Sequence, residues 1–261
     1  MAPPSVTWIS VAPVKGLALL QRDEVRLERS GVTDDRRFHL ISPTGRLLNG
    51  KQLAPLVQVT PDWVEESGFL SLRFPDGTVV ADIIELGEPV ATDFYQLRDV
   101  RGRLVVGPWS DALSDFLGQP VRLVQPERQN DGTDRGPGIV TILSTGSLDA
   151  LRDRAGLAEA IDPRRFRMLF GVDGVDRHEE DSWKGRTVQI GQAEVHVRGN
   201  VGRCIVTSRH PETGARTLAT LDLLAEYRED VETTEPLPFG VWGTVATPGR
   251  VRLGDQVVPP A

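Results

Sequence analysis

Cysteine is nearly absent from this sequence: Cys204 is the one thiol among 261 residues. A single thiol excludes an intrachain disulfide, and it cannot supply the several cysteines that a structural zinc cage or an iron–sulfur cluster usually needs. A lone cysteine can be an inert core residue, a nucleophile, or the one protein ligand of a soft metal that is held mainly by another group. The composition leaves all three possibilities open.

Long apolar runs and an excess of positive charge are also lacking. No stretch approaches the roughly 20 apolar residues that a membrane-spanning helix needs, and the N-terminal residues lack the basic and then apolar order of a signal peptide. The formal net charge is −7, which argues against general binding to the phosphate backbone of nucleic acids. We therefore expect a globular, cytoplasmic protein with no membrane insertion and no nucleic-acid partner, and a reduced thiol fits that compartment.

Most of the chain predicts short β-strands, because apolar or alternating runs are separated by Gly, Pro, Asp and Asn. The segment Pro75-Asp-Gly-Thr78 predicts the turn of a hairpin. Repeated short strands of this kind favour sheets or a barrel. The predicted strands are residues 25–27, 38–41, 56–60, 69–74, 78–80, 121–124, 187–190, 194–198 and 203–207.

Helices are predicted in three places, where a capping residue precedes apolar positions three and four apart. Residues 110–118 begin with a Ser and end with a Gly, residues 147–156 repeat that plan, and residues 216–227 contain a helix capped by Thr220. Residues 125–138 are almost free of apolar side chains and predict an exposed loop. A domain boundary before this loop divides the chain into residues 1–124 and 125–261.

The residues around Cys204 do not decide its role. Arg203, Arg209 and His210 would lower the pKa of the thiol if they faced it, but alternation along a strand would point Arg203 to the opposite side. No spacing singles out a base for a nucleophilic thiol. The candidate bases are His178, His196 and His210.

Longer segments resemble a known family. Arg203-Cys-Ile-Val-Thr-Ser208, followed by His210-Pro-Glu-Thr-Gly214, resembles the cysteine segment of the molybdenum cofactor sulfurase C-terminal (MOSC) family. Further matches cover nearly the whole chain in the family's order. They are Ala12-Pro-Val-Lys-Gly16, Gly31-Val-Thr-Asp-Asp-Arg-Arg-Phe38, Ser144-Thr-Gly-Ser-Leu148, Arg165-Phe-Arg167, Glu179-Glu-Asp-Ser-Trp183, Phe239-Gly240 and Val251-Arg-Leu-Gly-Asp255.

The resemblance implies a mainly β (α+β) fold, with an N-terminal MOSC-type β domain packed on a MOSC β-barrel and a few peripheral helices. More narrowly, the chain is similar to the branch that contains the mitochondrial amidoxime-reducing component and its bacterial relatives. That branch holds a molybdopterin cofactor between its domains. The resemblance implies that Cys204 ligates molybdenum, and a soft thiolate suits a metal that already carries the two sulfurs of a pterin dithiolene.

The resemblance also implies which residues bind the cofactor. A lysine and an arginine would grip its phosphate, one as a point charge and the other as a planar fork. Without the family match, Lys15 and Arg36 are more simply explained by surface pairing with acidic residues 34 and 35, and Ser147 by a helix N-cap. The implied cofactor-binding residues are Lys15, Gly16, Arg36, Ser147, Arg167, Gly202 and Arg203.

Several positions depart from the family pattern. Met168 and Leu169 stand where Pro-Asn is common, and Thr145 stands where an acidic residue is expected, which puts a polar cofactor contact and proton handling in doubt. Gly16 replaces a common Ser. The acidic residues 179–181 are interpreted mainly as a solvated loop.

The leading hypothesis is a molybdenum cofactor-dependent oxidoreductase that reduces N-hydroxylated or related N-oxygenated small molecules. The chain has no cysteines for an electron-transfer cluster, so we expect a separate electron-donating reductase or redox carrier as partner. The alternative is a molybdenum cofactor or sulfur carrier that uses Cys204 without redox turnover. A third possibility is a scaffold that keeps the fold and binds nothing.

Overall fold

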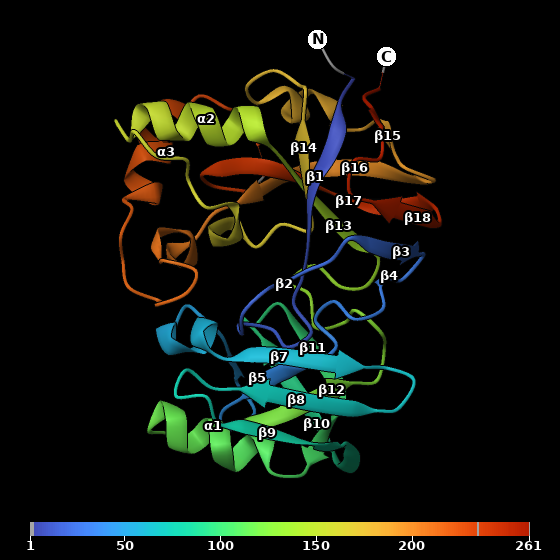
Figure 1. Cartoon of the computed structure of the whole chain (residues 1–261), viewed down its shortest axis with the longest axis vertical. Helices are drawn as coiled ribbons and strands as arrows, with labels where there is room; N and C mark the ends of the chain where they lie inside the picture. Colours follow the sequence, from blue (N-terminus) through green and yellow to red (C-terminus); the bar gives the residue numbers. More distant parts are fainter. Residues whose placement is uncertain (1–2, 234, 261) are drawn as a thin grey trace.

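Two β-rich halves form the molecule (Figure 1). The computed structural model describes residues 3–233 and 235–260. Both chain ends lie at the outer end of the upper half in Figure 1. The predicted mainly β fold with a few peripheral helices is confirmed.

The upper half is built on an eight-stranded sheet. Its members are β1 (Ser5–Val11), β2 (Leu20–Gln21), β13 (Ile139–Ser144), β14 (Phe170–Asp173), β15 (Thr187–Ile190), β16 (Ala193–Gly202), β17 (Pro238–Thr247) and β19 (Val257–Val258). They lie in the order β19-β15-β16-β17-β13-β14-β1-β2, and β13 and β14 run parallel to each other. A three-stranded sheet in the order β18-β3-β4 completes this half, from β18 (Gly249–Arg252), β3 (Glu24–Glu28) and β4 (Gly31–Val32).

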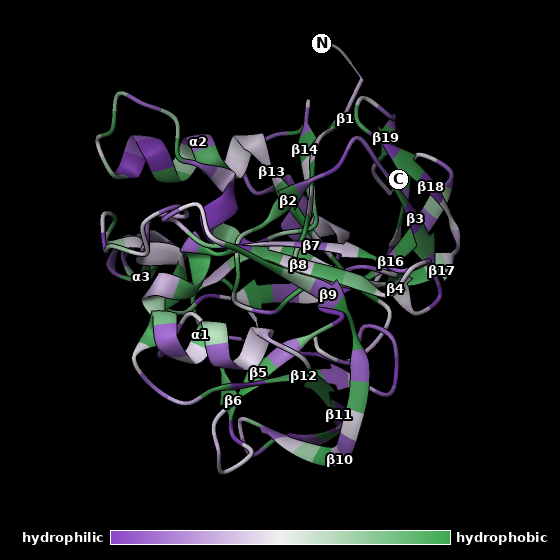
Figure 2. Cartoon of the chain, turned by 60° about the horizontal axis from the view of Figure 1, so that its bottom comes forward, coloured by the Kyte–Doolittle hydropathy of each residue, from purple (hydrophilic) through white to green (hydrophobic). Residues whose placement is uncertain are grey.

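The lower half contains two further sheets. The five-stranded sheet has the order β10-β11-β12-β5-β6, from β10 (Glu85–Phe94), β11 (Arg98–Val106), β12 (Arg122–Pro126), β5 (His39–Ile41) and β6 (Leu47–Leu48). The three-stranded sheet joins β7 (Thr60–Val64), β8 (Phe69–Arg73) and β9 (Val79–Ile83). The predicted hairpin is confirmed, since Phe74 N–H donates to Thr78 O between β8 and β9. Figure 2 shows both hydrophobic and hydrophilic residues along β10.

Each half buries its own apolar cluster. The core of the upper half includes Ile9, Phe170 and Trp183, and that of the lower half includes Phe38 and Trp109. In β7 and β15 exposed and buried residues alternate, so one face of each of these two strands packs into the core.

Within the described residues, three α-helices lie at the edges of the sheets: α1 (Trp109–Leu117), α2 (Thr145–Arg154) and α3 (Thr220–Arg228). The predicted stop of α1 is confirmed, because Gly118 takes a left-handed conformation (φ 65°). The predicted caps are wrong: α1 starts after Pro108, α2 after Ser144, and α3 after Ala219. None of the helices in the described part of the chain has the length and apolarity to span a bilayer.

The 3₁₀-helices are η1 (Ala54–Gln58), η2 (Pro163–Phe166), η3 (Glu179–Trp183) and η4 (Ile205–Ser208). Two of them replace predicted strands. Residues 203–207 do not extend β16, because the chain turns into η4 directly after Cys204. Most of residues 56–60 belong to η1, which is buried through Leu56 and Val57.

The two halves do not divide at a single point in the sequence. Strands β1 and β3 come from the first 28 residues, yet they pair with β14 and β18 in the upper half. The chain then enters the lower half and leaves it after β12. The boundary between residues 124 and 125 stays a prediction, and it falls inside β12.

Candidate functional site

A cleft of about 620 Å³ contains Cys204 and is lined from both halves of the molecule. Lys15, Arg36 and Asn49 line it from the N-terminal part of the chain, whereas Arg167 lines it from the C-terminal part. Six of the seven predicted cofactor-binding residues line this cleft together with Cys204, namely Lys15, Gly16, Arg36, Arg167, Gly202 and Arg203. Most of the residues that the sequence singled out thus lie around one cavity of the structure.

Cys204 lies at the junction between β16 and η4. It has extended backbone angles (φ −132°, ψ 176°) and is the N-cap residue of η4. Its carbonyl oxygen accepts hydrogen bonds from the backbone N–H of Thr207 at 3.1 Å and from the Thr207 hydroxyl at 3.0 Å. These bonds fix the backbone that carries the thiol, and the half-buried thiol is free.

Arg203 is buried beside the thiol but does not offer its guanidinium to the cleft. Nη1 donates to Phe166 O at 3.0 Å, and Nε donates to Phe239 O at 2.8 Å. Burial lowers the pKa of Arg203 to about 9, and Arg135 contributes to the same direction. Because these donors bind main-chain oxygens, Arg203 ties the cysteine segment to η2 and β17.

Lys15 is a buried cation in the cleft, with a side chain 10% exposed. Its Nζ lies 2.6 Å from Asp134 Oδ1. Burial lowers the pKa of Lys15, while the charge and hydrogen bond of Asp134 oppose that change. Gly16 follows with φ +94°, and a Cβ there would lie 3.2 Å from Leu56 Cδ1. A Ser at position 16 would therefore strain the backbone beside Lys15.

Arg36 and Arg167 lie next to each other. Arg36 Nη2 donates to Arg167 O at 3.0 Å, and both residues have left-handed φ values of 51° and 54°. Arg36 also pairs with Asp35, but this pair is buried and so is not the surface pair that the simpler explanation assumed. Arg167 donates to Leu17 O at 2.8 Å, and no carboxylate of the described residues lies within ion-pair distance of it. Burial, together with the charge of Arg36, lowers the pKa of Arg167 to about 10.

Arg37 lies outside the cleft. Its guanidinium donates to Pro126 O at 3.1 Å and lies 3.6 Å from Glu65. Its neighbour Arg36 sits in a left-handed turn and lines the cleft instead.

The backbone N–H of Gly202 is not available to a ligand in the cleft, because it is already hydrogen-bonded. Its N–H donates to Glu235 Oε2 at 2.8 Å, and Glu235 in turn pairs with Arg135. A Cβ at Gly202 would lie 2.8 Å from the Cβ of Glu235. The close approach of this acidic loop therefore requires a glycine before Arg203 and Cys204.

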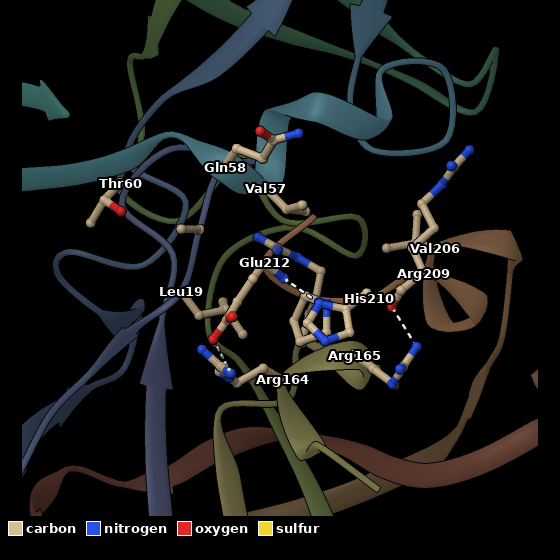
Figure 3. Close-up of a pocket in the computed structure, with 13 residues that line it drawn as sticks. Leu19, Val57, Gln58, Thr60, Arg164, Arg165, Val206, Arg209, His210 and Glu212 are labelled. Carbon is tan, nitrogen blue, oxygen red and sulfur yellow. Dashed lines mark hydrogen bonds and ion pairs between the residues drawn. The ribbon is translucent and has the colours of Figure 1, made fainter. Parts of the chain in front are cut away.

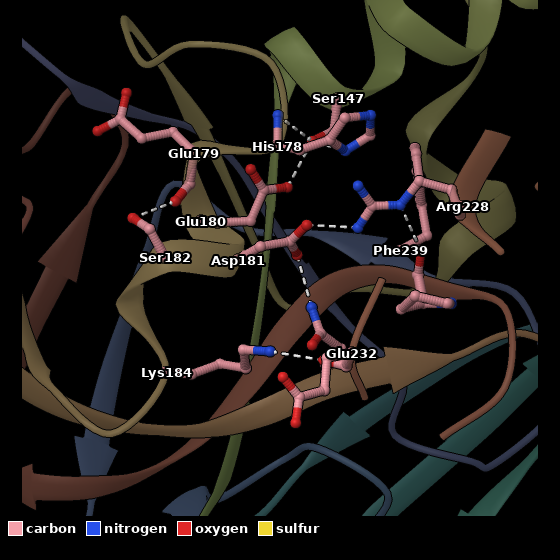
Figure 4. Close-up of polar contacts among 12 residues, drawn as sticks. Ser147, His178, Glu179, Glu180, Asp181, Ser182, Lys184, Arg228, Glu232 and Phe239 are labelled. Atoms are coloured by element: carbon pink, nitrogen blue, oxygen red, sulfur yellow. Dashed lines mark hydrogen bonds and ion pairs between the residues drawn. The ribbon is translucent and has the colours of Figure 1, made fainter. Parts of the chain in front are cut away.

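Ser147 is the predicted site residue that the structure does not bring to the cleft. Its side chain is fully buried, and its hydroxyl donates to Glu180 Oε1 at 2.6 Å and lies 3.1 Å from His178 Nδ1 (Figure 4). The N-cap of α2 is Ser144, whose hydroxyl accepts from Ser147 N–H at 3.0 Å. Ser147 therefore belongs to a buried polar cluster behind α2.

The interpretation of residues 179–181 as a solvated loop is wrong. Glu180 is fully buried and accepts hydrogen bonds from Ser144 and Ser147. Burial raises the pKa of Glu180, although those hydrogen bonds oppose the change. Asp181 accepts from Arg228, whose guanidinium is almost wholly buried (Figure 4).

The departures from the family pattern lie in two different places. Met168 and Leu169 line the cleft and are each 2% exposed, and the Met168 sulfur lies 3.1 Å from Arg203 Nη2. Thr145 lies outside the cleft and hydrogen-bonds to Asp173. Met168, Leu169 and the third departure, Gly16, therefore change the wall of the cavity, whereas Thr145 does not.

Sequence reasoning missed the cleft residues that come from residues 125–138 and from the β10–β11 turn. The expected exposed loop is partly buried, and it places Asp134 and Arg135 in the cleft. Tyr95 enters from the turn, where its hydroxyl accepts a hydrogen bond from Asn49 Nδ2 at 2.6 Å. The Asp-Arg pair within the Gly-rich loop of residues 125–138 was the sequence signal that could have indicated these two cleft residues.

The cleft can hold a phosphate and one soft metal bond. Lys15, Arg36 and Arg167 supply cations, and the thiol of Cys204 supplies a soft ligand. Within residues 3–233 and 235–260, no group of three or more His, Cys, Asp or Glu side chains is placed to hold a metal ion by itself. Any metal in this cleft would therefore depend on ligands that another molecule brings.

The fold and cleft define a two-part β protein with a single thiol set among cations. The profile of the MOSC N-terminal beta barrel domain matches residues 4–118, and that of the MOSC domain matches residues 133–258. The chain belongs to the MOSC family, as its sequence motifs predicted.

Two curated relatives match over almost the whole chain. The chain is 26% identical to mitochondrial amidoxime-reducing component 1 of Danio rerio, over 97% of this chain and 83% of that protein. It is 25% identical to molybdenum cofactor sulfurase of Danio rerio, over 98% of this chain and 34% of that protein. This chain thus spans about a third of the sulfurase. Among solved structures, YUAD protein from Bacillus subtilis matches over 97% of this chain and 94% of that chain, with 13% identity and a TM-score of 0.44.

Proposed function

We propose that this protein is a molybdenum cofactor-dependent oxidoreductase that reduces N-hydroxylated or related N-oxygenated small molecules. Membership of the MOSC family and the similarity to the two curated relatives support a role associated with the molybdenum cofactor. The observation that carries the proposal is the position of Cys204 in one cleft with Lys15, Arg36 and Arg167.

The residues of the cleft fit the cofactor. Lys15 and Arg36 would hold its phosphate, and Arg167 would add a guanidinium that has no carboxylate partner among the described residues. Cys204 would bind the metal through its thiolate. When bound, the cofactor supplies the two-electron redox chemistry at molybdenum, and the protein supplies binding and positioning.

The other cleft residues support that role. Arg203 fixes the cysteine segment through Phe166 and Phe239, so the thiol has a defined position. Apolar Met168 and Leu169 exclude water from one wall of the cavity. A substrate would enter the remaining part of the cleft, and the electrons would come from a separate reductase or redox carrier.

The first experiment measures molybdenum and pterin in protein made in a cofactor-competent host. Native protein should contain both, and Cys204→Ser should lose the metal or hold it with an altered metal spectrum. Reduction of N-hydroxylated amidines by the native protein with an artificial electron donor should follow. Absence of molybdenum from both proteins after cofactor-replete expression would reject the oxidoreductase and leave the carrier or the scaffold.

The carrier remains the second candidate, because the half-buried thiol of Cys204 is free and could hold sulfur. It predicts transfer of cofactor to an apo acceptor enzyme and no reduction of N-hydroxylated amidines by cofactor-loaded protein. The same preparation decides between the two functions.

A further inference from the structure

A second cavity of about 270 Å³ adjoins the cleft of Cys204. The two cavities share Val57, Arg165, Arg167 and Val206 as lining residues. Figure 3 shows Arg164 and Arg165 entering this second cavity from η2, opposite Val57 and Gln58 of η1. We call it the arginine cavity. A ligand that occupies both cavities would lie against the same arginines.

The arginine cavity carries guanidinium groups that no carboxylate neutralises. Among the described residues, neither Arg165 nor Arg167 has a carboxylate within ion-pair distance. Arg165 Nη1 donates to Arg209 O at 2.8 Å, and its Nη2 donates to Thr217 Oγ1 at 2.7 Å. These bonds orient the guanidinium of Arg165 through neutral oxygens and leave its charge available, since a guanidinium has five N–H donors.

Glu212, the acidic residue that lines the cavity, already forms an ion pair. Glu212 pairs with Arg164 at 2.8 Å (Figure 3), and Arg164 also pairs with Asp162 at 2.6 Å. Arg209 adds a further positive charge to the lining, and its buried Nε has no hydrogen-bond partner among the described residues. The cavity is therefore locally positive in a chain whose formal net charge is −7.

The cofactor phosphate does not account for this charge. Lys15 and Arg36, which we assign to the phosphate, line the larger cleft and not the arginine cavity. Burial lowers the pKa of Arg165. An arginine guanidinium is effectively always protonated in proteins, so Arg165 supplies a positive charge at neutral pH. A half-buried arginine of this kind binds a planar oxyanion with paired hydrogen bonds.

We propose that the arginine cavity binds a carboxylate group of the substrate, while the N-oxygenated end of the same molecule reaches the cleft of Cys204. This inference rests on the proposed function and narrows its substrate class to N-oxygenated compounds that carry a carboxylate. Arg165 contacts the carboxylate directly, and Val206 lies on the wall between the two ends of the substrate.

The test compares two ligands that differ only in the carboxylate: benzamidine and 4-amidinobenzoate, the amidines that reduction of their N-hydroxy forms would give. Binding to cofactor-loaded protein is measured by isothermal titration calorimetry. The carboxylate should tighten binding about tenfold or more, as expected for a charge-assisted hydrogen bond. Arg165→Gln should remove most of this gain, so it should weaken the binding of 4-amidinobenzoate much more than that of benzamidine.

Two further variants separate the charge from the fold. Arg165→Lys keeps the charge without the planar fork and should retain part of the gain. Arg216→Gln removes an exposed arginine from the segment between η4 and α3, outside both cavities, and should behave as the native protein. A carboxylate that gives no gain in native protein, or a gain that Arg165→Gln leaves intact, would overturn the inference.

The N-hydroxy forms of both ligands separate this inference from the proposed function. Suppose that neither N-hydroxy compound is reduced but the tighter binding of the carboxylate ligand depends on Arg165. The anion site is then supported and the reductase function is rejected. Suppose instead that both compounds are reduced with equal KM and that Arg165→Gln changes neither KM. The reductase function is then supported and the anion site is rejected.

Discussion

The guanidinium of Arg203 donates hydrogen bonds to the main-chain oxygen of Phe239, and this contact joins the residue before Cys204 to the start of β17. The same side chain reaches Phe166 at the end of η2. Three segments that are distant in sequence therefore meet at one buried cation. The position of the thiol depends on this junction as well as on the hydrogen bonds of its own carbonyl group.

Replacing this arginine should loosen the site. Arg203→Lys cannot bind both carbonyl groups with a planar fork, so the free energy of unfolding should fall by about 1–3 kcal/mol. Urea denaturation of cofactor-free protein measures the change. Arg216→Lys, on the exposed loop, should stay within about 0.5 kcal/mol of the native value. Equal stability of Arg203→Lys and native protein would show that the junction does not depend on the fork.

The buried carboxyl of Glu180 should make stability depend on pH. Burial raises its pKa in the folded state, so the folded protein binds this proton more tightly than the unfolded chain does. Stability from this group is present below the unfolded pKa of 4.5 and is lost as the pH rises through the raised folded value. Glu180→Gln, which cannot ionise, should therefore gain stability relative to native protein between pH 4.5 and neutral pH.

Urea denaturation at several pH values tests this expectation. Glu180→Ala serves as the contrast, because it leaves the hydroxyls of Ser144 and Ser147 without their carboxyl partner and should cost about 1–3 kcal/mol. A constant difference between Glu180→Gln and native protein across this range would mean that Glu180 does not titrate there.

His39 should make the protein sensitive to acid. Burial, with Lys15 and Arg98 adding repulsion, lowers its pKa to about 3. The unfolded chain then binds the proton more tightly, so stability is lost as the pH falls from about 6.5 toward 3, by at most about 1.4 kcal/mol for each pH unit. His39→Gln should lose less stability over this range, as measured by urea denaturation.

His196→Gln is the matched control for that series, because His196 is not buried. Its pH dependence should follow the native protein. If His39→Gln keeps the full acid sensitivity, another group is responsible for it.

Local sequence signals predicted a turn and a helix end correctly where neighbouring residues alone determine the backbone conformation. Pro75-Asp-Gly-Thr78 forms its hairpin, and Gly118 ends α1. Lys15, Arg36 and Arg167 were found through the family resemblance, and no spacing in the sequence would have joined them, since the cleft brings together residues from both halves.

The errors have tertiary causes. A Glu-Glu-Asp run is usually solvated, but Glu180 meets two serines across the start of α2, and these hydrogen bonds make its burial possible. Ser144 and Ser147 are both plausible caps three residues apart, and packing on Glu180 decides between them. Residues 125–138 were expected to be exposed because they lack apolar side chains, yet their polar groups bond to both halves, as Asn130 Nδ2 does to Ser30 O at 2.7 Å.

Asp134 should weaken rather than strengthen cofactor binding. Asp134 Oδ1 lies 2.6 Å from Lys15 Nζ, so a bound phosphate would have to share the Lys15 ammonium group with this carboxylate. The side chain of Asp134 is 51% exposed, so its pairing with Lys15 is worth only about 1 kcal/mol or less. Asp134→Asn should therefore retain the cofactor up to about fivefold more tightly during dialysis, as measured by molybdenum and pterin content.

Lys15→Gln should lose the cofactor faster than native protein under the same conditions. Asp131→Asn is the control, because Asp131 pairs with Arg98 and does not line the cleft. If Asp134→Asn instead loses the cofactor as Lys15→Gln does, Asp134 holds Lys15 in the binding position, and the carboxylate belongs to the cofactor site itself. Either result assigns a role to a residue that the sequence placed in an exposed loop.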